Sequence, residues 1–440
     1  MAFAFDGQGS MYIGAGKKLY QDFPDFAAEI GQYDYLCQLH GFPGIINIID
    51  GSTEEQDTTP IANSLAIVCI EMALASVWKL LGIHPTIVIG HSLGEYAALH
   101  VAGVLSASDA IYLVGKRAQL CLQLCEVDSH SMLAVRASTD QILQCLEGMS
   151  FEFACRNSRN ENVLAGSKAE ISGARDCLEE LGYKCHELEV PFAFHSAQMD
   201  PILDEFEAIA HRVIFQAPNI PVISPLLSKV VFDAKTLNAK YLRDATRRPV
   251  EFVAALEVAQ KMQLVDSNTA WIDVGAHPIC SNFIRSSIPS STIVIASLHR
   301  KEDNWTTLAN SCAVLHSAGI QVDWSEYHRP FEASHLLLDL PKYSWNNKTY
   351  WIQYNGTWAL TKGNDSGATV DPQVIESPLR TSSVHRVLHE EIRKPWEGSL
   401  ILESDVMQSD FLEAAWGHKM NSCAVVTSVG NNILRMTYIC

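Results

Sequence analysis

Residues 87–95 have the sequence Ile-Val-Ile-Gly-His-Ser-Leu-Gly-Glu, which is the most informative stretch of the chain. A short apolar run leads into a Gly-x-Ser-x-Gly motif, and helix-forming residues follow at 96–99. This pattern predicts a strand, a sharp turn and a helix, with the Ser92 hydroxyl exposed at the end of a parallel sheet. The start of that helix would offer unpaired N–H groups to an oxyanion, so the motif indicates acyl-transfer chemistry. The alternative is a tight turn with an incidental serine.

Composition indicates a folded enzyme with more than one domain. The chain has 440 residues, of which 48% are hydrophobic and 19% are charged, so wholesale disorder is excluded. Its formal net charge is −18. Nucleic-acid binding needs clustered Lys and Arg, which this acidic chain does not show, and we therefore expect no nucleic-acid partner.

The longest apolar run, residues 67–83, contains Glu71 and Lys79. Both charges would be costly inside a bilayer, so the run predicts a buried core helix and no membrane span. The first five residues contain no basic leader, and we expect a cytoplasmic protein. Of twelve cysteines only Cys121 and Cys125 are close in sequence, so neither a zinc site nor disulfides are expected.

The order of apolar segments predicts two intertwined parts in the first three quarters of the chain. Residues 1–130 and 191–340 alternate short apolar runs with amphipathic stretches, which is typical of an α/β core with a largely parallel sheet. Residues 131–190 follow a β-α-β-β-α-β order, which predicts an inserted ferredoxin-like α+β subdomain. We expect a cleft between the two parts.

The remaining residues have a different character. Residues 341–354 are aromatic and irregular, and we expect them to form a strap lying over a domain. Residues 355–382 are rich in Gly, Ser, Thr and Asp and predict a flexible linker. Residues 383–440 regain apolar patterning but are too few for a robust core of their own.

Four further motifs accompany the serine motif. They are Phe-x-Phe-x-Gly-Gln-Gly-Ser at 3–10, Gly-Lys-Arg-Ala at 115–118, Phe-His-Ser at 194–196 and Gly-Ala-His-Pro at 275–278. In this order they resemble the malonyl-CoA:acyl carrier protein acyltransferase family, from residue 3 to about residue 352. The later segments resemble most closely the acyltransferase of fungal non-reducing polyketide synthases. The resemblance implies an α/β fold with a hydrolase-like parallel-sheet core.

The resemblance also implies a catalytic arrangement. Ser92 would be the nucleophile and His195 the base that takes its proton. A backbone carbonyl, expected to be that of Glu251, would orient the histidine. The backbone N–H groups of Gln8 and Leu93 would form the oxyanion hole.

Three residues are expected to select the substrate. Arg117 would pair with the free carboxylate of a malonyl group, because a planar guanidinium can hold a carboxylate through two hydrogen bonds. Asn157 would line the pocket, and Phe194 would crowd an α-methyl branch. The alternatives are a solvated surface charge for Arg117 and a turn residue for Asn157. His91 is expected to support the turn at Ser92.

The chain departs from the family pattern at three positions. Asp6 stands where Pro or Thr is usual, Met11 replaces a glutamine, and Ser64 falls where a pocket glutamine is expected. These changes could weaken malonyl binding or loosen selectivity.

Residues 383–387 and 417–421 resemble the opening of the product-template domain of the same synthases. The resemblance implies a truncated hot-dog-like segment in which His418 matches that domain's catalytic base. That base needs an acidic partner far downstream, so we expect His418 to be stranded and the chain to be a fragment of a larger synthase.

The function expected from the resemblance is malonyl transfer in polyketide biosynthesis. Malonyl-CoA would acylate Ser92, and the phosphopantetheine thiol of an acyl carrier protein would then take the malonyl group. Partners would be that carrier protein and other synthase domains, and no bound cofactor or metal is expected. The rivals are a serine hydrolase or thioesterase, which Arg117 disfavours, and a catalytically weak remnant that acts only in binding.

Overall fold

The computed structural model of the protein describes residues 1–288, 293–345, 348, 386–394, 397–403, 419–420 and 423–424. The chain divides into two units, Met1–Leu336 and Leu337–Cys440. All of the predicted site residues except His418 belong to the first unit. His418, most of the predicted strap and the predicted linker lie outside the described residues.

A six-stranded sheet forms the centre of the first unit, with the strand order β10-β9-β1-β2-β7-β8. All neighbours are parallel except β7 and β8, which are antiparallel. The strands are β1 (Ala2–Phe5), β2 (Ile87–Gly90), β7 (Val222–Ser224), β8 (Lys229–Val231), β9 (Trp271–Val274) and β10 (Val294–Ala296). Every residue of β1, β2 and β9 is buried, which explains why these strands are continuously apolar instead of alternating, with Asp273 of β9 as their one charged residue. The predicted α/β fold with a largely parallel sheet is confirmed.

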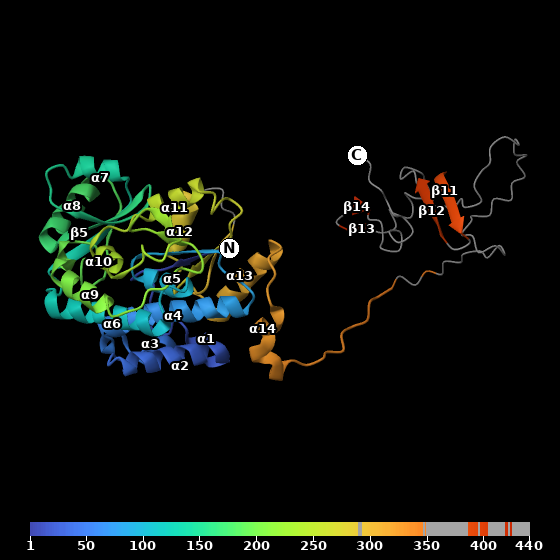
Figure 1. The fold of residues 1–440 in the computed structure, drawn as a ribbon, viewed down its shortest axis with the longest axis horizontal. Coiled ribbons are helices and arrows are strands. Elements are labelled where there is room, and N and C mark those ends of the chain that lie inside the picture. The colour runs from blue at the N-terminus through green and yellow to red at the C-terminus, as the bar shows by residue number, and fades with distance from the viewer. Residues whose placement is uncertain are drawn as a thin grey trace, which may run out of the picture. The chain divides into compact units, whose positions relative to one another are not determined.

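Helices cover both faces of this sheet (Figure 1). On one side α4 and α5 pack against it, and α2 and α6 pack behind them. On the other side lie α11 and α12. These helices are α2 (Pro24–Leu39), α4 (Pro60–Leu80), α5 (Glu95–Val101), α6 (Ala107–Leu124), α11 (Phe252–Lys261) and α12 (Cys280–Ser287).

Helix α4 is the predicted buried core helix. It is long and apolar enough to cross a membrane by those criteria alone, but 83% of its most apolar window is buried inside the protein. Thr59 caps its start by accepting a hydrogen bond from the Ala62 N–H, and Pro60 occupies the first helical position. Its hydrophobicity on all sides follows from being enclosed between the sheet and other helices.

A second, antiparallel sheet in the same unit has four strands in the order β4-β5-β3-β6. Along the chain the elements are β3 (His130–Val135), α7 (Thr139–Cys145), β4 (Glu152–Ser158), β5 (Glu161–Ser167), α8 (Lys168–Glu180) and β6 (Cys185–Glu187). Capping boxes at Ser138 and Ser167 begin the two helices. A separate small core, which includes Leu133, Leu164 and Ile171, lies between α8 and this sheet.

The small sheet is joined to the segment before α11 by a short backbone pairing. Cys155 of β4 forms an isolated parallel bridge with Val250, and β4 also contacts α11 and α12. The Arg156 N–H donates to the Val250 carbonyl over 2.8 Å, and the Val250 N–H donates to the Ala154 carbonyl over 2.9 Å. This connection holds the small sheet next to the segment that precedes α11.

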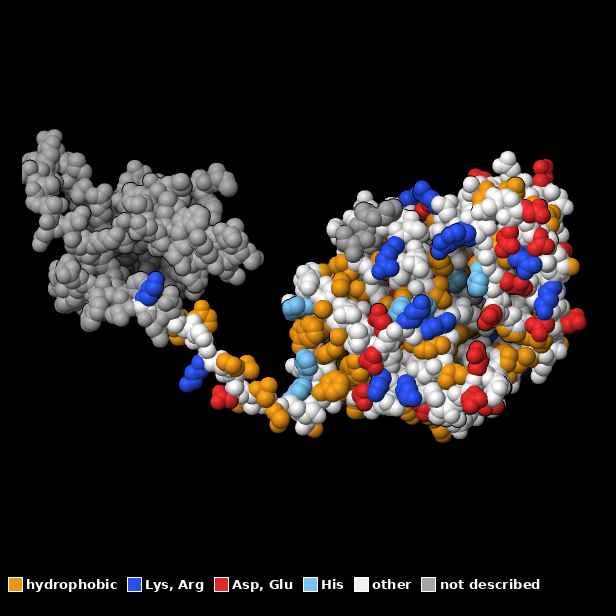
Figure 2. Space-filling model, turned by 180° about the vertical axis from the view of Figure 1, so that it is seen from behind, with side chains coloured by type: hydrophobic (Ala, Val, Ile, Leu, Met, Phe, Trp, Pro, Cys, Tyr) orange, Lys and Arg blue, Asp and Glu red, His pale blue; other side chains and the backbone are white. Residues whose placement is uncertain are grey.

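The remaining helices complete the first unit. They are α1 (Lys17–Asp22), α3 (Ile46–Asp50), α9 (Leu203–Ala210), α10 (Ala239–Arg247), α13 (Asn304–Ser317) and α14 (Trp324–His328), with short 3₁₀ helices η1 (Glu55–Asp57), η2 (Ser92–Gly94), η3 (Ala197–Ile202) and η4 (Arg329–Ser334). On the face seen in Figure 2, acidic side chains gather toward the end that carries α7 and α8, with Lys and Arg among them. Basic side chains on this face are therefore interspersed with acidic ones.

The described part of the second unit is small. Strands β11 (Arg386–Lys394) and β12 (Glu397–Glu403) form an antiparallel pair, as do β13 (Lys419–Met420) and β14 (Cys423–Ala424). In the predicted strap, the side chains of Tyr343 and Trp345 are 72% and 75% exposed. The strap, the linker and the hot-dog-like segment remain predictions.

Candidate active site

The turn at Ser92 has the geometry that its motif predicts. Strand β2 ends at Gly90, and η2 leads directly into α5, while Ser92 itself has a φ of 53°. A Cβ at Gly90 would lie 2.3 Å from the Glu95 Cα, and one at Gly94 would lie 2.2 Å from the Asp6 carbonyl oxygen. Only glycine fits at these two positions, so the motif is a steric requirement of the turn. The strained backbone at Ser92 is typical of a functional position.

The side chains of Ser92 and His195 meet although 103 residues separate them in sequence. The Ser92 Oγ lies 2.7 Å from the His195 Nε2, and the His195 Nδ1 lies 2.9 Å from the Arg248 carbonyl oxygen. A carbonyl can only accept, so Nδ1 carries the proton and Nε2 is free to accept from the serine hydroxyl. His195 also has a positive φ, 59°, in the segment before η3. The structure thus brings together the predicted nucleophile and base.

The carbonyl that orients His195 belongs to Arg248, so the prediction of Glu251 was wrong. Helix α10 ends before Arg248, whose extended backbone leaves its carbonyl outside the helical pattern. The Glu251 carbonyl accepts from the Ala255 N–H, 3.0 Å away, as part of the first turn of α11. Its carboxylate pairs with Arg156. Glu251 therefore begins a helix and binds the small sheet, and its carbonyl is not free for the histidine.

The charge state of His195 suits a base. Burial, together with the nearby Arg117 guanidinium, lowers the pKa of His195 to about 3. The imidazole is therefore neutral near neutral pH, with Nε2 ready to accept the Ser92 proton. Burial also lowers the pKa of His91, next to the serine.

Arg117 projects from α6 into the protein interior and is 6% exposed. Its side chain donates no hydrogen bond to any residue that the structure describes, and its Nε is fully buried. The Phe194 ring lies against the guanidinium, with 5.1 Å between the Arg117 Cζ and the ring centroid. The surface-charge alternative was therefore wrong. A buried guanidinium with no hydrogen-bond acceptor among the described residues is suited to binding an anion.

A small pocket of about 20 Å³ lies beside Arg117 and Phe194, and it is also bordered by Gln8, Ser64, Leu93 and Pro191. The Ser64 hydroxyl donates to the Pro60 carbonyl oxygen over 2.8 Å, so its hydrogen is already used within α4. At the position where the family has a pocket glutamine, Ser64 therefore has no free hydrogen to donate to a ligand, and its small side chain leaves room in the pocket.

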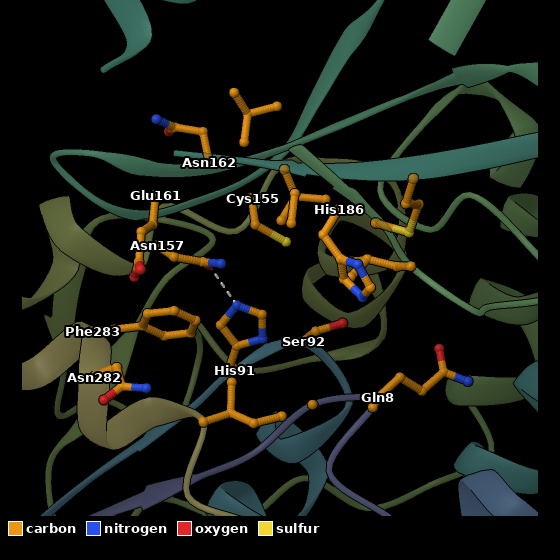
Figure 3. A pocket seen from close by; sticks show the side chains of 18 of the residues that line it. Gln8, His91, Ser92, Cys155, Asn157, Glu161, Asn162, His186, Asn282 and Phe283 are labelled. Carbon is orange, nitrogen blue, oxygen red and sulfur yellow. Dashed lines mark hydrogen bonds between the residues drawn. The ribbon is translucent and has the colours of Figure 1, made fainter. Parts of the chain in front are cut away.

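A larger cavity of about 470 Å³ is lined by Ser92 and His195, and it shares Gln8 and Phe194 with the small pocket. Segments that follow strands β1 and β2 of the main sheet line it together with strand residues of the small sheet. Figure 3 shows Asn157 pointing down from β4 toward His91, while Ser92 lies beside His91 and near Gln8. The Asn157 Oδ1 lies 2.7 Å from the His91 Nε2. Asn157 is a strand residue, so its turn alternative was wrong, and its amide holds His91 beside the turn.

The two predicted oxyanion donors flank the serine. Gln8 borders both the larger cavity and the small pocket, and Leu93 borders the small pocket. Within the part of the chain that the structure describes, the Gln8 N–H has no hydrogen-bond acceptor. That N–H is therefore available to a ligand, and the oxyanion role of both groups remains a prediction.

The other two departures from the family pattern lie away from the reacting atoms. Met11 borders a neighbouring cavity of about 780 Å³, which shares Gln8 and Val190 with the first. Asp6 is fully buried in the core, where its Oδ1 accepts from the Cys280 N–H over 3.1 Å. The concern that Asp6 weakens malonyl binding has no support from this position.

Asp6, Asp273 and Cys280 are the one group of three metal-ligating side chains found in the described residues, with ligand atoms within 4.8 Å of one another. The carboxylates of Asp6 and Asp273 accept from the N–H groups of Cys280 and Ser281, at the start of α12. Burial raises the pKa of both carboxyls, that of Asp273 to about 6. Their position in the core separates them from the cavity at Ser92.

Sequence reasoning missed Arg248 as the residue that orients His195. The signal available for it was the end of an amphipathic helix directly before Pro249, since the last carbonyls of a helix have no partner within it. Sequence reasoning also assigned no role to Glu95 or Tyr241. The contacts between them depend on two helices that are 146 residues apart in the chain.

Comparison with known proteins agrees with this geometry. The chain is 52% identical over 430 residues to an atrochrysone carboxylic acid synthase of Aspergillus chevalieri, covering 97% of this chain and 24% of that protein. It is 47% identical over 438 residues to the non-reducing polyketide synthase PKS8-1 of Pseudocercospora fijiensis, covering 97% of this chain and 25% of that protein. The chain therefore spans about a quarter of the length of these relatives.

Solved structures show the same fold. The acyltransferase domain from the second module of the salinomycin polyketide synthase has a TM-score of 0.67 and 30% identity, covering 77% of this chain and 79% of that one. A malonyl CoA-acyl carrier protein transacylase of Clostridium perfringens has a TM-score of 0.64 and 22% identity, covering 72% and 98%, and shows the fold alone. Residues 2–322 match the acyl transferase domain family. The chain belongs to the acyl transferase domain family.

Proposed function

We propose that this chain transfers a malonyl group from malonyl-CoA to the phosphopantetheine thiol of an acyl carrier protein, in polyketide biosynthesis. The observation that carries the proposal is the buried Arg117 guanidinium, which has no hydrogen-bond acceptor among the described residues and lies in a pocket beside the nucleophile. The free carboxylate of a malonyl group would supply the missing acceptor. An acetyl group would leave the guanidinium unpaired.

In the first half-reaction Ser92 attacks the thioester carbonyl. The Nε2 of His195 accepts the hydroxyl proton as the bond between Oγ and the carbonyl carbon forms, and the Arg248 carbonyl stabilises the resulting imidazolium at Nδ1. The N–H groups of Gln8 and Leu93 would bind the oxyanion. When the C–S bond breaks, His195 returns the proton to the leaving thiolate, and CoA departs.

The second half-reaction repeats these steps with the carrier thiol as nucleophile. His195 takes the thiol proton, the thiolate attacks the malonyl-Ser92 ester, and the proton returns to the Ser92 oxygen. Phe194 covers the Arg117 guanidinium and narrows the pocket, which would favour malonyl over a branched acyl group. The proposal needs no cofactor on this chain.

We infer further that residues 131–190 form a ferredoxin-like subdomain, which the strand order β4-β5-β3-β6 supports. Its strand β4 supplies Asn157, and its neighbouring strands line the larger cavity. The carrier protein and other synthase domains would be the partners of the chain. That assignment rests on the similarity to fungal non-reducing polyketide synthases.

Intact-mass measurement after mixing the full chain with malonyl-CoA tests the proposal. A malonyl adduct should form and map to Ser92, Ser92→Ala should form none, and His195→Ala should form it at least about 100-fold more slowly. Added carrier protein bearing phosphopantetheine should then take the malonyl group. Release of free malonate instead would indicate a hydrolase, and the absence of any adduct would indicate a remnant that only binds.

A further inference from the structure

A chain of hydrogen bonds lies behind the nucleophile and ends on Glu95, the first residue of α5. The Leu227 N–H donates to the Ser224 Oγ over 3.2 Å, and the Ser224 and Tyr241 oxygens are 2.7 Å apart. The Tyr241 hydroxyl donates to the Glu95 Oε1. Because Tyr241 gives its hydrogen to Glu95, Ser224 must give its own to Tyr241, so every donor points toward the carboxylate.

This chain of hydrogen bonds connects the two elements that hold the reacting side chains. Glu95 lies directly after η2, which contains Ser92. Tyr241 lies on α10, and Arg248 at the end of α10 supplies the carbonyl that holds His195. The contact between Glu95 and Tyr241 therefore joins the support of the nucleophile to the support of the base.

Little space separates this contact from the reacting atoms. A cavity of about 10 Å³ is bordered by Glu95, Ser92, His195 and Arg248. That volume is at most about the size needed for one water molecule. The side chains of Glu95 and Tyr241 are both buried, so a shift of either one would be transmitted to the neighbouring groups rather than absorbed by solvent.

We propose that Glu95 and Tyr241 are positioning residues, which clamp α5 to α10 and so set the distance between the Ser92 hydroxyl and the His195 imidazole. This inference rests on the proposed acyl transfer through Ser92. Neither residue touches the acyl group. They act by setting the geometry of Ser92 and His195, which do contact the acyl group.

The clamp has a distinctive dependence on pH. Burial raises the pKa of Glu95 to about 7, and it would be higher still without Tyr241 from α10 and Arg117 from α6, which both lower it. Helix α4 also packs on α5, but its buried Glu71 interacts with Asp6 and Asp273 and does not shift the pKa of Glu95. An ionised Glu95 is the stronger acceptor for the tyrosine hydroxyl, so the clamp tightens as pH rises through about 7.

The base itself does not titrate in that range. The pKa of His195 lies near 3, so His195 is already neutral from mildly acid to alkaline pH. A fall in acylation rate below about pH 7 would therefore report Glu95 and not the general base.

The experiment measures the single-turnover rate of Ser92 acylation by malonyl-CoA, by intact mass, on the full chain across this pH range. Wild type should lose about 10-fold in rate from the alkaline to the acid side of pH 7. Glu95→Gln keeps an acceptor but no charge, so it should show the low rate at every pH. Tyr241→Phe removes the hydrogen bond that forms the clamp, so it should also show the low rate at every pH.

Tyr33→Phe is the matched control, since it removes the hydroxyl of another buried tyrosine, on α2, and should match wild type. If Tyr241→Phe fails to fold, Glu95→Gln decides the question alone. If folded Glu95→Gln loses acylation rate below about pH 7 in the same way as wild type, the inference is overturned and the proposed function still stands. Absence of acylation in wild type would instead reject the proposed function.

Discussion

Two regions of the first unit contain buried ionisable groups with unpartnered polar atoms: one holds a cation and the other holds carboxyls. Around Arg117 a single cation lacks a hydrogen-bond acceptor. Beneath the Ser92 turn, the carboxyls of Asp6, Glu71 and Asp273 are together in the core, and each has at least one buried oxygen without a partner in the described residues.

The regions differ in what can reach them. Arg117 borders a pocket beside Ser92, so a carboxylate of the substrate can complete it. The three acids lie away from the cavities. Burial raises the pKa of each, Asp273 raises that of Asp6 further, and Asp6 and Asp273 raise that of Glu71 further. They can be satisfied only by protons. A buried ionisable group without a partner thus indicates a binding function where a ligand can enter. Where no ligand can enter, it indicates a cost in stability.

The largest expected effect comes from Arg117→Met, which removes the cation but keeps an unbranched apolar side chain. Acylation by malonyl-CoA should fall about 100-fold or more, because the charge-assisted pair with the substrate carboxylate is lost. Acylation by acetyl-CoA should be equal or faster, since acetyl has no carboxylate. Parallel single-turnover measurements with the two thioesters check both statements.

Lys116→Met is the control, because it removes the neighbouring cation of α6, whose Nζ is bound by Gln119 outside the pocket. It should leave both rates unchanged. If Arg117→Met lowers the acylation rates with malonyl-CoA and acetyl-CoA equally, Arg117 supports the fold of the pocket and does not select the acyl group.

A smaller effect is expected from Asp6→Asn, which acts on stability. The amide oxygen can still accept from the Cys280 N–H, and the new amide hydrogens would lie next to the Asp273 carboxyl, which has an oxygen within 4.8 Å of one on Asp6. We expect the free energy of unfolding at neutral pH to rise by about 1–3 kcal/mol. Chemical denaturation measures this change, and malonyl acylation should keep its wild-type rate. A loss of stability would mean that the Asp6 carboxylate has a cation partner in the folded protein.

The smallest effect is the dependence of that gain on pH. The folded-state pKa of Asp6 is raised, so its contribution to stability is fully present below the unfolded pKa of about 4 and is lost as pH rises through the folded value. The advantage of Asp6→Asn should therefore be near zero at about pH 4 and should grow toward neutral pH. Histidines are the same in both proteins and cancel in the comparison. A gain that does not change with pH would exclude ionisation of Asp6 as its cause.

Much of this protein could be predicted from its sequence. The apolar run before Gly90 predicts a buried parallel strand, since both faces of such a strand are covered. The small residues around Ser92 predict a tight turn, because no Cβ fits there. Ordered motifs bring Ser92, His195 and Arg117 into one family pattern. These features depend on local sterics, on periodicity or on motif order, and each of these follows directly from the order of residues in the chain.

Tertiary structure alone decided the rest. Arg248 and Glu251 are three residues apart, and which carbonyl faces His195 depends on where α10 ends and α11 begins in space. The lone Arg117 guanidinium and the Asp6 carboxyl cannot be recognised from sequence as buried or unpaired. Whether a charge has a partner depends on every element that packs around it, and those elements come from distant parts of the chain.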